Sequence, residues 1–434
     1  MKIQRVRGTR DVYPEDMVVR NWLVEAWRRV SIRNGFVEFD GPMIEYLDLY
    51  RAKSGEELVG ELFTINSRGG EELGIRPEMT PTLARMINAR VHSLPRPIKW
   101  FSLGAVYRGE RPQRGRMREF LQWNIDIVGV DELVADAESI FVAVDLMREV
   151  GLTPEDVVVW INDRRLMGAL FDALGIPEER HGRAYALVDR SEKMERAQLA
   201  AAWNGDLGDA VSFDRFEPLL ALDSLAALRS CKEPVLAQGE VADRVRVLDS
   251  LFMLLQDFGI TEFCDFNMKI VRGLAYYTGC VYEAFDRKGE LRAILGGGRY
   301  DNLLEALGGP SVSGVGFGMG DAVLGELLAE LGRLPSGEPR VDVYLVAADD
   351  EATSTVLQLA AELRGRGVGA DFGYRRQAVG KQFKAAAARG AVRCVVVGAE
   401  TRERSSVTVK DMATGKQAEM PVAGFLDDPM APVT

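Results

Sequence analysis

Residues 107–129 have the sequence YRGERPQRGRMREFLQWNIDIVG, in which a loop crowded with arginines leads into a strand pattern. Five arginines lie between positions 108 and 118, and Glu110 is the only acidic residue among them. Residues 98–108 and 120–129 have strand character, which predicts an antiparallel hairpin with the arginines at its tip. Planar guanidinium groups on a rigid hairpin suit a polyphosphate, although a merely solvated basic loop would have the same composition.

The second strand of this hairpin alternates between polar and apolar side chains. Side chains point alternately to the two faces of a strand. One face is therefore predicted to carry Gln122, Asn124 and Asp126, and the other Trp123, Ile125 and Ile127. Such a row of hydrogen-bonding groups suits a small polar ligand.

Three shorter motifs also carry chemistry. Arg76-Pro77-Glu78-Met79-Thr80 places a carboxylate and a hydroxyl at the start of a predicted helix, where they either cap that helix or bind an ammonium group. VRGLAYYTG (271–279) is predicted to be one strand, with Tyr276 and Tyr277 on opposite faces. GGGRYD (296–301) is predicted to follow a strand at 291–295, and its glycines permit close approach to a ligand without matching a Walker or Rossmann loop.

The helix and strand patterns in the rest of the chain predict several domains, and the length of 434 residues predicts the same. Amphipathic helices are predicted at 15–34 and 132–150, and a Gly-rich strand at 311–320 precedes a helix from Asp321. Alternating strands and helices follow the linker at 333–340. The predicted domains are a first domain in two parts (1–163 and 261–332), a helical insertion (164–260) and a C-terminal α/β domain (339–434).

Composition excludes several classes of protein. The net charge of −11 argues against a protein that coats nucleic acid non-specifically. With two histidines and four scattered cysteines, a His-based triad or zinc site is nearly excluded, so that no metal-ligating side chains are assigned. The first residues lack the apolar core of a signal peptide, and no apolar run of membrane-spanning length occurs, so we expect a cytoplasmic protein without a membrane partner.

Taken together and in order, these motifs resemble the class II aminoacyl-tRNA synthetases, and within them the histidyl-tRNA synthetase family. The resemblance covers essentially the whole chain, from RGTRDVYP through RPEMT and YRGERPQRGR to RGLAYYTG, GGGRYDNL and the C-terminal module. RGLAYYTG together with GFGMGD looks most like the cyanobacterial and plant-organelle type. The implied fold, of the α/β class, is a two-part catalytic domain with an antiparallel sheet flanked by helices, a helical insertion and an α/β anticodon-binding domain.

The resemblance also implies roles for individual residues. It assigns histidine binding to Glu78, Thr80, Gln122, Asp126, Tyr276 and Tyr277, with Asp126 and Tyr277 reading the imidazole. It assigns catalysis and ATP binding to Arg108 and Arg272, further ATP contacts to Glu110, Arg116 and Phe120, and the acceptor end of the tRNA to Arg111 and Gln113. Mg²⁺ would accompany ATP and neutralise its β- and γ-phosphates.

The chain departs from the family pattern at three positions. Gly109 replaces a histidine, Ala275 replaces an aspartate, and Val323 stands where the motif 3 arginine normally contacts adenine and the γ-phosphate. We expect adenine to rest on an apolar surface here, with the phosphates held by Arg116 or Arg118.

The implied partners are L-histidine, tRNA(His) and a second copy of the chain, bound through residues 15–45. Residues 375–393 hold six basic residues and no acid, which suits an anticodon stem or a plain solvated helix face. Three alternatives remain. The first is an inactive, histidine-sensing regulatory subunit of ATP phosphoribosyltransferase, which usually lacks the C-terminal module and tends to lose the arginines. The second is a tRNA-sensing module of a kinase, for which no kinase signature is present. The third is a synthetase for a different amino acid, against which the set Glu78, Gln122, Asp126 and Tyr277 argues.

Overall fold

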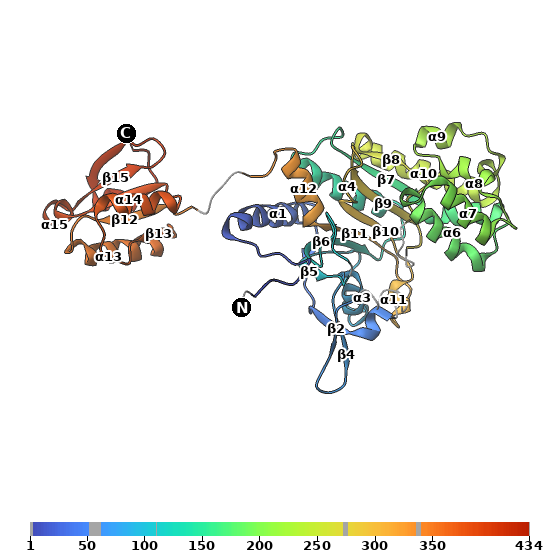
Figure 1. Ribbon diagram of the computed structural model, residues 1–434, viewed down its shortest axis with the longest axis horizontal. Coiled ribbons are helices and arrows are strands. Elements are labelled where there is room, and N and C mark those ends of the chain that lie inside the picture. The colour runs from blue at the N-terminus through green and yellow to red at the C-terminus, as the bar shows by residue number, and fades with distance from the viewer. Residues whose placement is uncertain (1–2, 52–61, 110, 272–276, 336–339, 434) are drawn as a thin grey trace. The chain divides into compact units, whose positions relative to one another are not determined.

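The computed structural model describes residues 3–51, 62–109, 111–271, 277–335 and 340–433 (Figure 1). The chain divides into a large unit, which contains Arg20–Leu334, and a smaller unit, which contains Pro335–Thr434. Each unit has its own sheet, and the two are described in turn.

The large unit is built on a mainly antiparallel sheet of eight strands. Their order is β1 (Val37–Glu38), β5 (Ile98–Tyr107), β6 (Glu119–Val128), β11 (Gly314–Gly320), β10 (Leu295–Arg299), β9 (Cys280–Asp286), β7 (Val157–Asp163) and β8 (Cys264–Phe266). Only the β1–β5 and β7–β8 pairs among these are parallel. The hairpin predicted around the arginine loop is confirmed, because β5 pairs with β6 from Ile98↔Val128 to Tyr107↔Glu119.

Helix α4 (Val134–Glu149) packs on the apolar face of this sheet, and helix α1 (Pro14–Arg33) contacts β6 there. The alternation predicted for β6 is confirmed, since Gln122, Asn124 and Asp126 line a cavity on the other face and the buried Trp123, Ile125 and Ile127 do not. Trp123 stacks on Trp27 of α1 and donates a hydrogen bond from Nε1 to Ser31 Oγ (2.9 Å). Burying one face in this way commits the polar residues of β6 to the opposite face.

A small sheet of three strands stands beside the large one. Its order is β2 (Ile44–Tyr46), β4 (Glu72–Ile75) and β3 (Thr64–Asn66), and helix α3 (Thr80–Asn88) follows it. Buried Arg76 links the two sheets, donating hydrogen bonds to the carbonyl oxygens of Ala105 on β5 and Gly41. That connection places the start of α3 next to the β5–β6 hairpin.

The segment from 164 to 260 is helical, as its composition predicts. Its helices are α5 (Arg164–Ala173), α6 (Glu178–Arg190), α7 (Arg196–Leu207), α8 (Phe213–Leu220), α9 (Leu225–Ser230) and α10 (Gly239–Asp257). Trp203 and Phe216 stack at 4.2 Å between ring centroids, with Phe171 beside them. These aromatic contacts join α5, α7 and α8 to one another, and the segment's status as an inserted domain stays a prediction.

Two strand predictions were wrong. Tyr277 and Thr278 precede β9, which begins at Cys280, so these residues do not continue a strand through the motif; residues 272–276 lie outside the described residues. The glycine run lies inside β10, whereas residues 291–294 are not in a strand. The glycines lie inside the sheet because the neighbouring strand packs closely against them. A β-carbon at Gly297 would lie 2.6 Å from both the Gly316 oxygen and Phe317 Cβ.

The smaller unit has a sheet in the order β13 (Ala370–Phe372), β12 (Val343–Ala347), β14 (Arg393–Val397), β15 (Ser406–Asp411), β16 (Gln417–Pro421). Its helices are α13 (Ala352–Gly365), α14 (Val379–Ala388), α15 (Ala399–Arg404) and α16 (Val422–Asp427). The alternating strands and helices predicted up to β15 are confirmed. Strand β16 and helices α15 and α16 were not predicted.

The basic stretch at 375–393 contributes fewer free cations than its sequence indicates. Arg376 pairs with Asp350 (2.6 Å) and Arg389 with Asp371 (3.0 Å). Arg393 is buried and donates to the Met430 oxygen. The exposed cations of this stretch without an acidic partner among the described residues are Arg375, Lys381 and Lys384.

Two further features concern the chain as a whole. All four cysteines are unpaired, and Cys264, Cys280 and Cys394 are buried. Within the described ranges, no helix combines the length and apolar character that crossing a membrane requires.

Candidate active site

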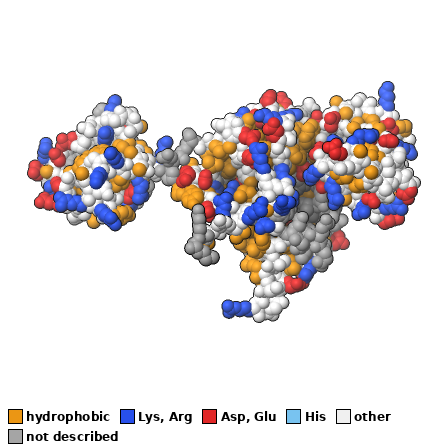
Figure 2. Space-filling view, viewed as in Figure 1, with side chains coloured by type: hydrophobic (Ala, Val, Ile, Leu, Met, Phe, Trp, Pro, Cys, Tyr) orange, Lys and Arg blue, Asp and Glu red, His pale blue; other side chains and the backbone are white. Residues whose placement is uncertain are grey.

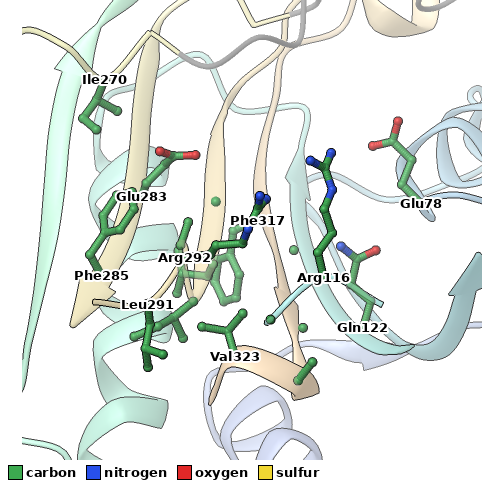
Figure 3. Close-up of a pocket in the computed structure, with 18 of the residues that line it drawn as sticks. Glu78, Arg116, Gln122, Ile270, Glu283, Phe285, Leu291, Arg292, Phe317 and Val323 are labelled. Atoms are coloured by element: carbon green, nitrogen blue, oxygen red, sulfur yellow. The ribbon is translucent and has the colours of Figure 1, made fainter. Parts of the chain in front are cut away.

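A cavity of about 560 Å³ opens on the polar face of the large sheet (Figure 3). Its floor comes from β6, β11, β10 and β9, and its walls from the starts of α3 and α12 (Asp321–Glu330), the arginine loop and the end of α6. A cavity of this size holds a small-molecule ligand. Most of the residues that the sequence singled out meet here.

Gln122, Asn124 and Asp126 line the cavity as a row, because glycines stand opposite them. Their partners across the β6–β11 pairing are Gly320, Gly318 and Gly316. A β-carbon at Gly316 would lie 2.2 Å from the Ile125 oxygen and 2.6 Å from Asp126 Oδ1. The alternate glycines of β11 therefore leave the space that the polar side chains of β6 fill.

Gly318→Ala is expected to weaken binding of the ligand that Gln122 contacts while leaving the fold intact. The added methyl would lie 2.6 Å from Gln122 Nε2, which is the movable end of a side chain and can be pushed aside. Displacing one hydrogen-bonding group costs about 1.4 kcal/mol, or roughly tenfold in the KM for that ligand. Steady-state kinetics and a thermal melt measure the two effects.

Gly325→Ala in α12 is the matched control for that variant, because no atom lies within 4 Å of the position its β-carbon would take. Gly325→Ala should leave the KM for that ligand unchanged. An equal rise in KM for both variants would contradict the role given to Gln122.

Asp126 is held by a neighbour to which the sequence assigned no role. The buried Tyr300 hydroxyl donates to Asp126 Oδ1 at 2.5 Å. Burial and the neighbouring carboxylate raise the pKa of Tyr300 well above its usual value, so the phenol stays protonated at neutral pH. Tyr300 thus fixes the orientation of Asp126. Tyr277, which was predicted to read the imidazole, is buried and lines the same cavity.

Glu78 and Thr80 are buried at the start of α3 and line the cavity. The residue at the N-cap position is Met79, whose side chain makes no capping hydrogen bond, so the interpretation of this motif as a side-chain helix cap is not supported. Figure 3 shows Glu78 and Gln122 on the same side of the cavity. Gln122 Oε1 is buried and accepts no hydrogen bond from any described residue, which leaves an acceptor for a ligand.

The arginines of the loop take different positions. Arg108 and Arg116 line the cavity together with Phe120, and the Arg108 guanidinium carbon lies 5.2 Å from the centre of the Phe120 ring. Arg114 is paired with Glu326 and Glu330 of α12, whereas Arg118 donates to the Arg7 oxygen. Of the two candidates for holding phosphates, the cavity therefore favours Arg116 over Arg118.

Some predicted site residues do not line the cavity or cannot be placed. Arg111 is exposed, and Gln113 accepts a hydrogen bond from Arg292 (2.8 Å). Glu110, Arg272 and Tyr276 lie outside the described residues, as does Ala275.

The cavity also contains residues that sequence reasoning missed. Glu283 and Phe285 on β9, Lys269 and Arg292 line it in addition to Tyr300. The alternation of Glu283 and Phe285 along CVYEAFD was a usable signal for the β9 pair, because both face the same side as the polar row of β6. Nothing in the local sequence marks Lys269 or Arg292.

The antiparallel sheet, the arginine hairpin and the polar cavity behind it are those of a class II aminoacyl-tRNA synthetase. The family model described as histidyl-tRNA synthetase matches residues 8–321, and the one described as anticodon binding domain matches residues 342–428. The chain belongs to the histidyl-tRNA synthetase family, and it is accordingly an aminoacyl-tRNA ligase.

The sequences of known relatives align with nearly the whole length of this chain. The chloroplastic/mitochondrial histidine–tRNA ligase of Arabidopsis thaliana is 39% identical over 95% of this chain and 84% of its own. The histidine–tRNA ligase of Opitutus terrae is 37% identical over 96% of both chains. The crystal structure of histidyl-tRNA synthetase from Nostoc sp. PCC 7120 has the same fold, with a TM-score of 0.81 at 24% identity over 99% of this chain and 100% of that one. The plant relative agrees with the predicted resemblance to the organellar type.

Proposed function

We propose that this chain ligates L-histidine to tRNA(His) in two steps. A histidine carboxylate oxygen attacks the α-phosphorus of ATP, the bond to the β-phosphate oxygen breaks, and histidyl-adenylate and pyrophosphate form. A ribose hydroxyl of the tRNA then attacks the histidyl carbonyl, and AMP leaves. The observation that carries this proposal is the buried Asp126–Tyr300 pair at one end of a cavity whose other side holds Arg108, Arg116 and Phe120.

The polar row supports histidine as the amino acid. Glu78, Thr80 and Gln122 offer a carboxylate, a hydroxyl and an amide oxygen, which together suit an ammonium group. Asp126 and Tyr277 would bind the two imidazole nitrogens, with Tyr276 assigned to the same pocket by the family resemblance. Because Tyr300 occupies Asp126 Oδ1, the imidazole would meet the other oxygen of that carboxylate.

The nucleotide would lie along the arginine side of the cavity. Arg108 would hold the α-phosphate, and Phe120 would stack on adenine through the ring face that Arg108 leaves open. Arg116 would bind the outer phosphates, and the family resemblance adds Arg272 and Glu110. The arginines stabilise charge that builds up at phosphorus, so the reaction requires no general base.

Mg²⁺ binds proteins through one or two carboxylates and completes its shell with water and substrate phosphates. The cavity fits such an ion, because Glu283 adds a carboxylate to the wall outside the histidine-binding set. Glu283 would hold the ion, which supplies charge neutralisation at the β- and γ-phosphates. Within the described residues no cluster of three or more metal-binding side chains occurs, so phosphate oxygens would provide most of the ligands.

Basic surfaces support tRNA as the second substrate. Figure 2 shows Lys and Arg side chains gathered on the visible face of the large unit. Arg111 and Gln113 would meet the acceptor end. In the smaller unit, Arg375, Lys381 and Lys384 would contact backbone phosphates of the anticodon stem.

Exposed apolar side chains support a homodimer formed through residues 15–45. In and next to this segment, Val37 is 63% exposed and Tyr46 is 61% exposed, and Met43 and Ile44 are exposed as well. Large apolar side chains exposed along one segment are typical of a protein interface. Light scattering at micromolar concentration should give twice the chain mass of 47.9 kDa, and a monomer would contradict the proposal.

Histidine-dependent exchange of labelled pyrophosphate into ATP tests the activity, with the other amino acids as controls. Exchange with histidine alone is expected. Absence of exchange while histidine still binds would instead support the inactive regulatory subunit, an alternative that the family matches over both the catalytic and the anticodon-binding modules do not favour.

A further inference from the structure

One end of the cavity has an apolar side chain where the family pattern has an arginine. Val323, in the first turn of α12, lines the cavity there with Phe285 and Leu291. Gly115 of the arginine loop packs against it, since a β-carbon on Gly115 would lie 3.3 Å from Val323 Cγ2. An apolar surface suits a purine ring but provides no charge for phosphates.

Arg292 brings a guanidinium group to the same place from a different part of the chain. The β-carbon position of Gly115 that touches Val323 is also 3.8 Å from Arg292 Cδ. Figure 3 shows Arg292 and Arg116 extending into the cavity from opposite sides, with Val323 below them. The two arginines therefore border the space above Val323.

No acidic side chain among the described residues neutralises the charge of Arg292. Arg292 Nη2 donates to Gln113 Oε1, which is a neutral acceptor. Neighbouring arginines differ in this respect, because Arg10 is paired with Asp321 and Arg114 with Glu326 and Glu330. A solvent-facing guanidinium without a carboxylate at the wall of a nucleotide-sized cavity is suited to an anionic ligand.

We propose that Arg292 binds the terminal phosphates of ATP and supplies, from the segment before β10, the guanidinium that α12 lacks at Val323. This inference rests on the proposed function. Arg108 would hold the α-phosphate, and Phe120 would stack on adenine. Gly115, beside Arg292, belongs to the arginine loop that connects these two residues. The same contact would hold pyrophosphate in the reverse reaction, because pyrophosphate is the β- and γ-phosphate portion of ATP.

Two substitutions of Arg292 by side chains of similar length separate the effect of charge from the effect of side-chain size. Arg292→Met removes the charge and keeps an unbranched stem, whereas Arg292→Lys keeps the charge. Lys288→Met is the matched control, since Lys288 is exposed on the turn that follows β9 and does not line the cavity. Histidine affinity and a thermal melt show whether each variant is folded.

In pyrophosphate exchange, Arg292→Met is expected to raise the KM for ATP and the KM for pyrophosphate by about 30-fold each, in the range of a lost hydrogen bond to a charged group. The KM for histidine and the inhibition constant of AMP should stay within about threefold, because neither ligand has terminal phosphates. Arg292→Lys should recover most of the loss, and Lys288→Met should match the parent chain.

The proposal is overturned if Arg292→Met changes the KM for ATP by less than about threefold, or if AMP binding weakens as much as ATP binding, which would indicate that Arg292 only positions the loop. It is also overturned if Arg292→Lys is as impaired as Arg292→Met. Failure of the proposed function gives a different result, because the parent chain itself would then show no histidine-dependent exchange.

Discussion

Arg108→Ala is expected to lower the rate of histidyl-adenylate formation by about a thousandfold, the loss typical of removing a group that stabilises transition-state charge. Arg108 lines the cavity, and its guanidinium is positioned by the Phe120 ring and by a hydrogen bond to the Pro77 oxygen (3.3 Å). The contact matters most when the phosphorus becomes five-coordinate, so the loss should appear in kcat with a smaller change in the KM for histidine.

Single-turnover adenylate formation measures this step directly. Arg114→Ala is the matched control from the same loop, because Glu326 and Glu330 hold Arg114 and it does not line the cavity. Arg114→Ala should lower the rate of adenylate formation by less than about fivefold. Equal losses in the two variants would mean that the loop requires overall positive charge and that Arg108 has no special position.

Asp126→Asn is expected to raise the KM for histidine by about 10- to 100-fold and to leave the KM for ATP nearly unchanged. The substitution keeps the shape of the side chain and the oxygen that accepts from Tyr300, but it removes the negative charge that an imidazole N–H would meet. Asp126 is only 2% exposed, so water cannot replace the lost interaction.

Exchange kinetics at varied histidine and varied ATP separate the two Michaelis constants for this variant. The control is Asp131→Asn, which removes one exposed carboxylate shortly after β6 and does not line the cavity. A rise in the KM for ATP equal to that for histidine would show that Asp126 shapes the whole cavity and does not read the imidazole.

Features that depend on neighbours along the chain could be predicted from the residues alone. The alternation of β6 fixed which side chains face the ligand, because Trp123, Ile125 and Ile127 could only be buried on the opposite face. Two strand patterns around the arginine loop were enough to predict the hairpin. The resemblance of whole motifs then assigned roles to Glu78, Gln122 and Asp126, all of which line one cavity.

The way in which distant segments meet became visible only in the folded protein. The fold placed the glycine run inside β10, where the strands pack too closely for a β-carbon. It brought Tyr300 to Asp126 across 174 positions and set Arg292 beside Val323. It also paired Arg376 and Arg389 with Asp350 and Asp371, which a count of basic residues could not anticipate. The physical reason is that sheet order and side-chain pairing depend on contacts between segments far apart in sequence, whereas periodicity reports only local burial.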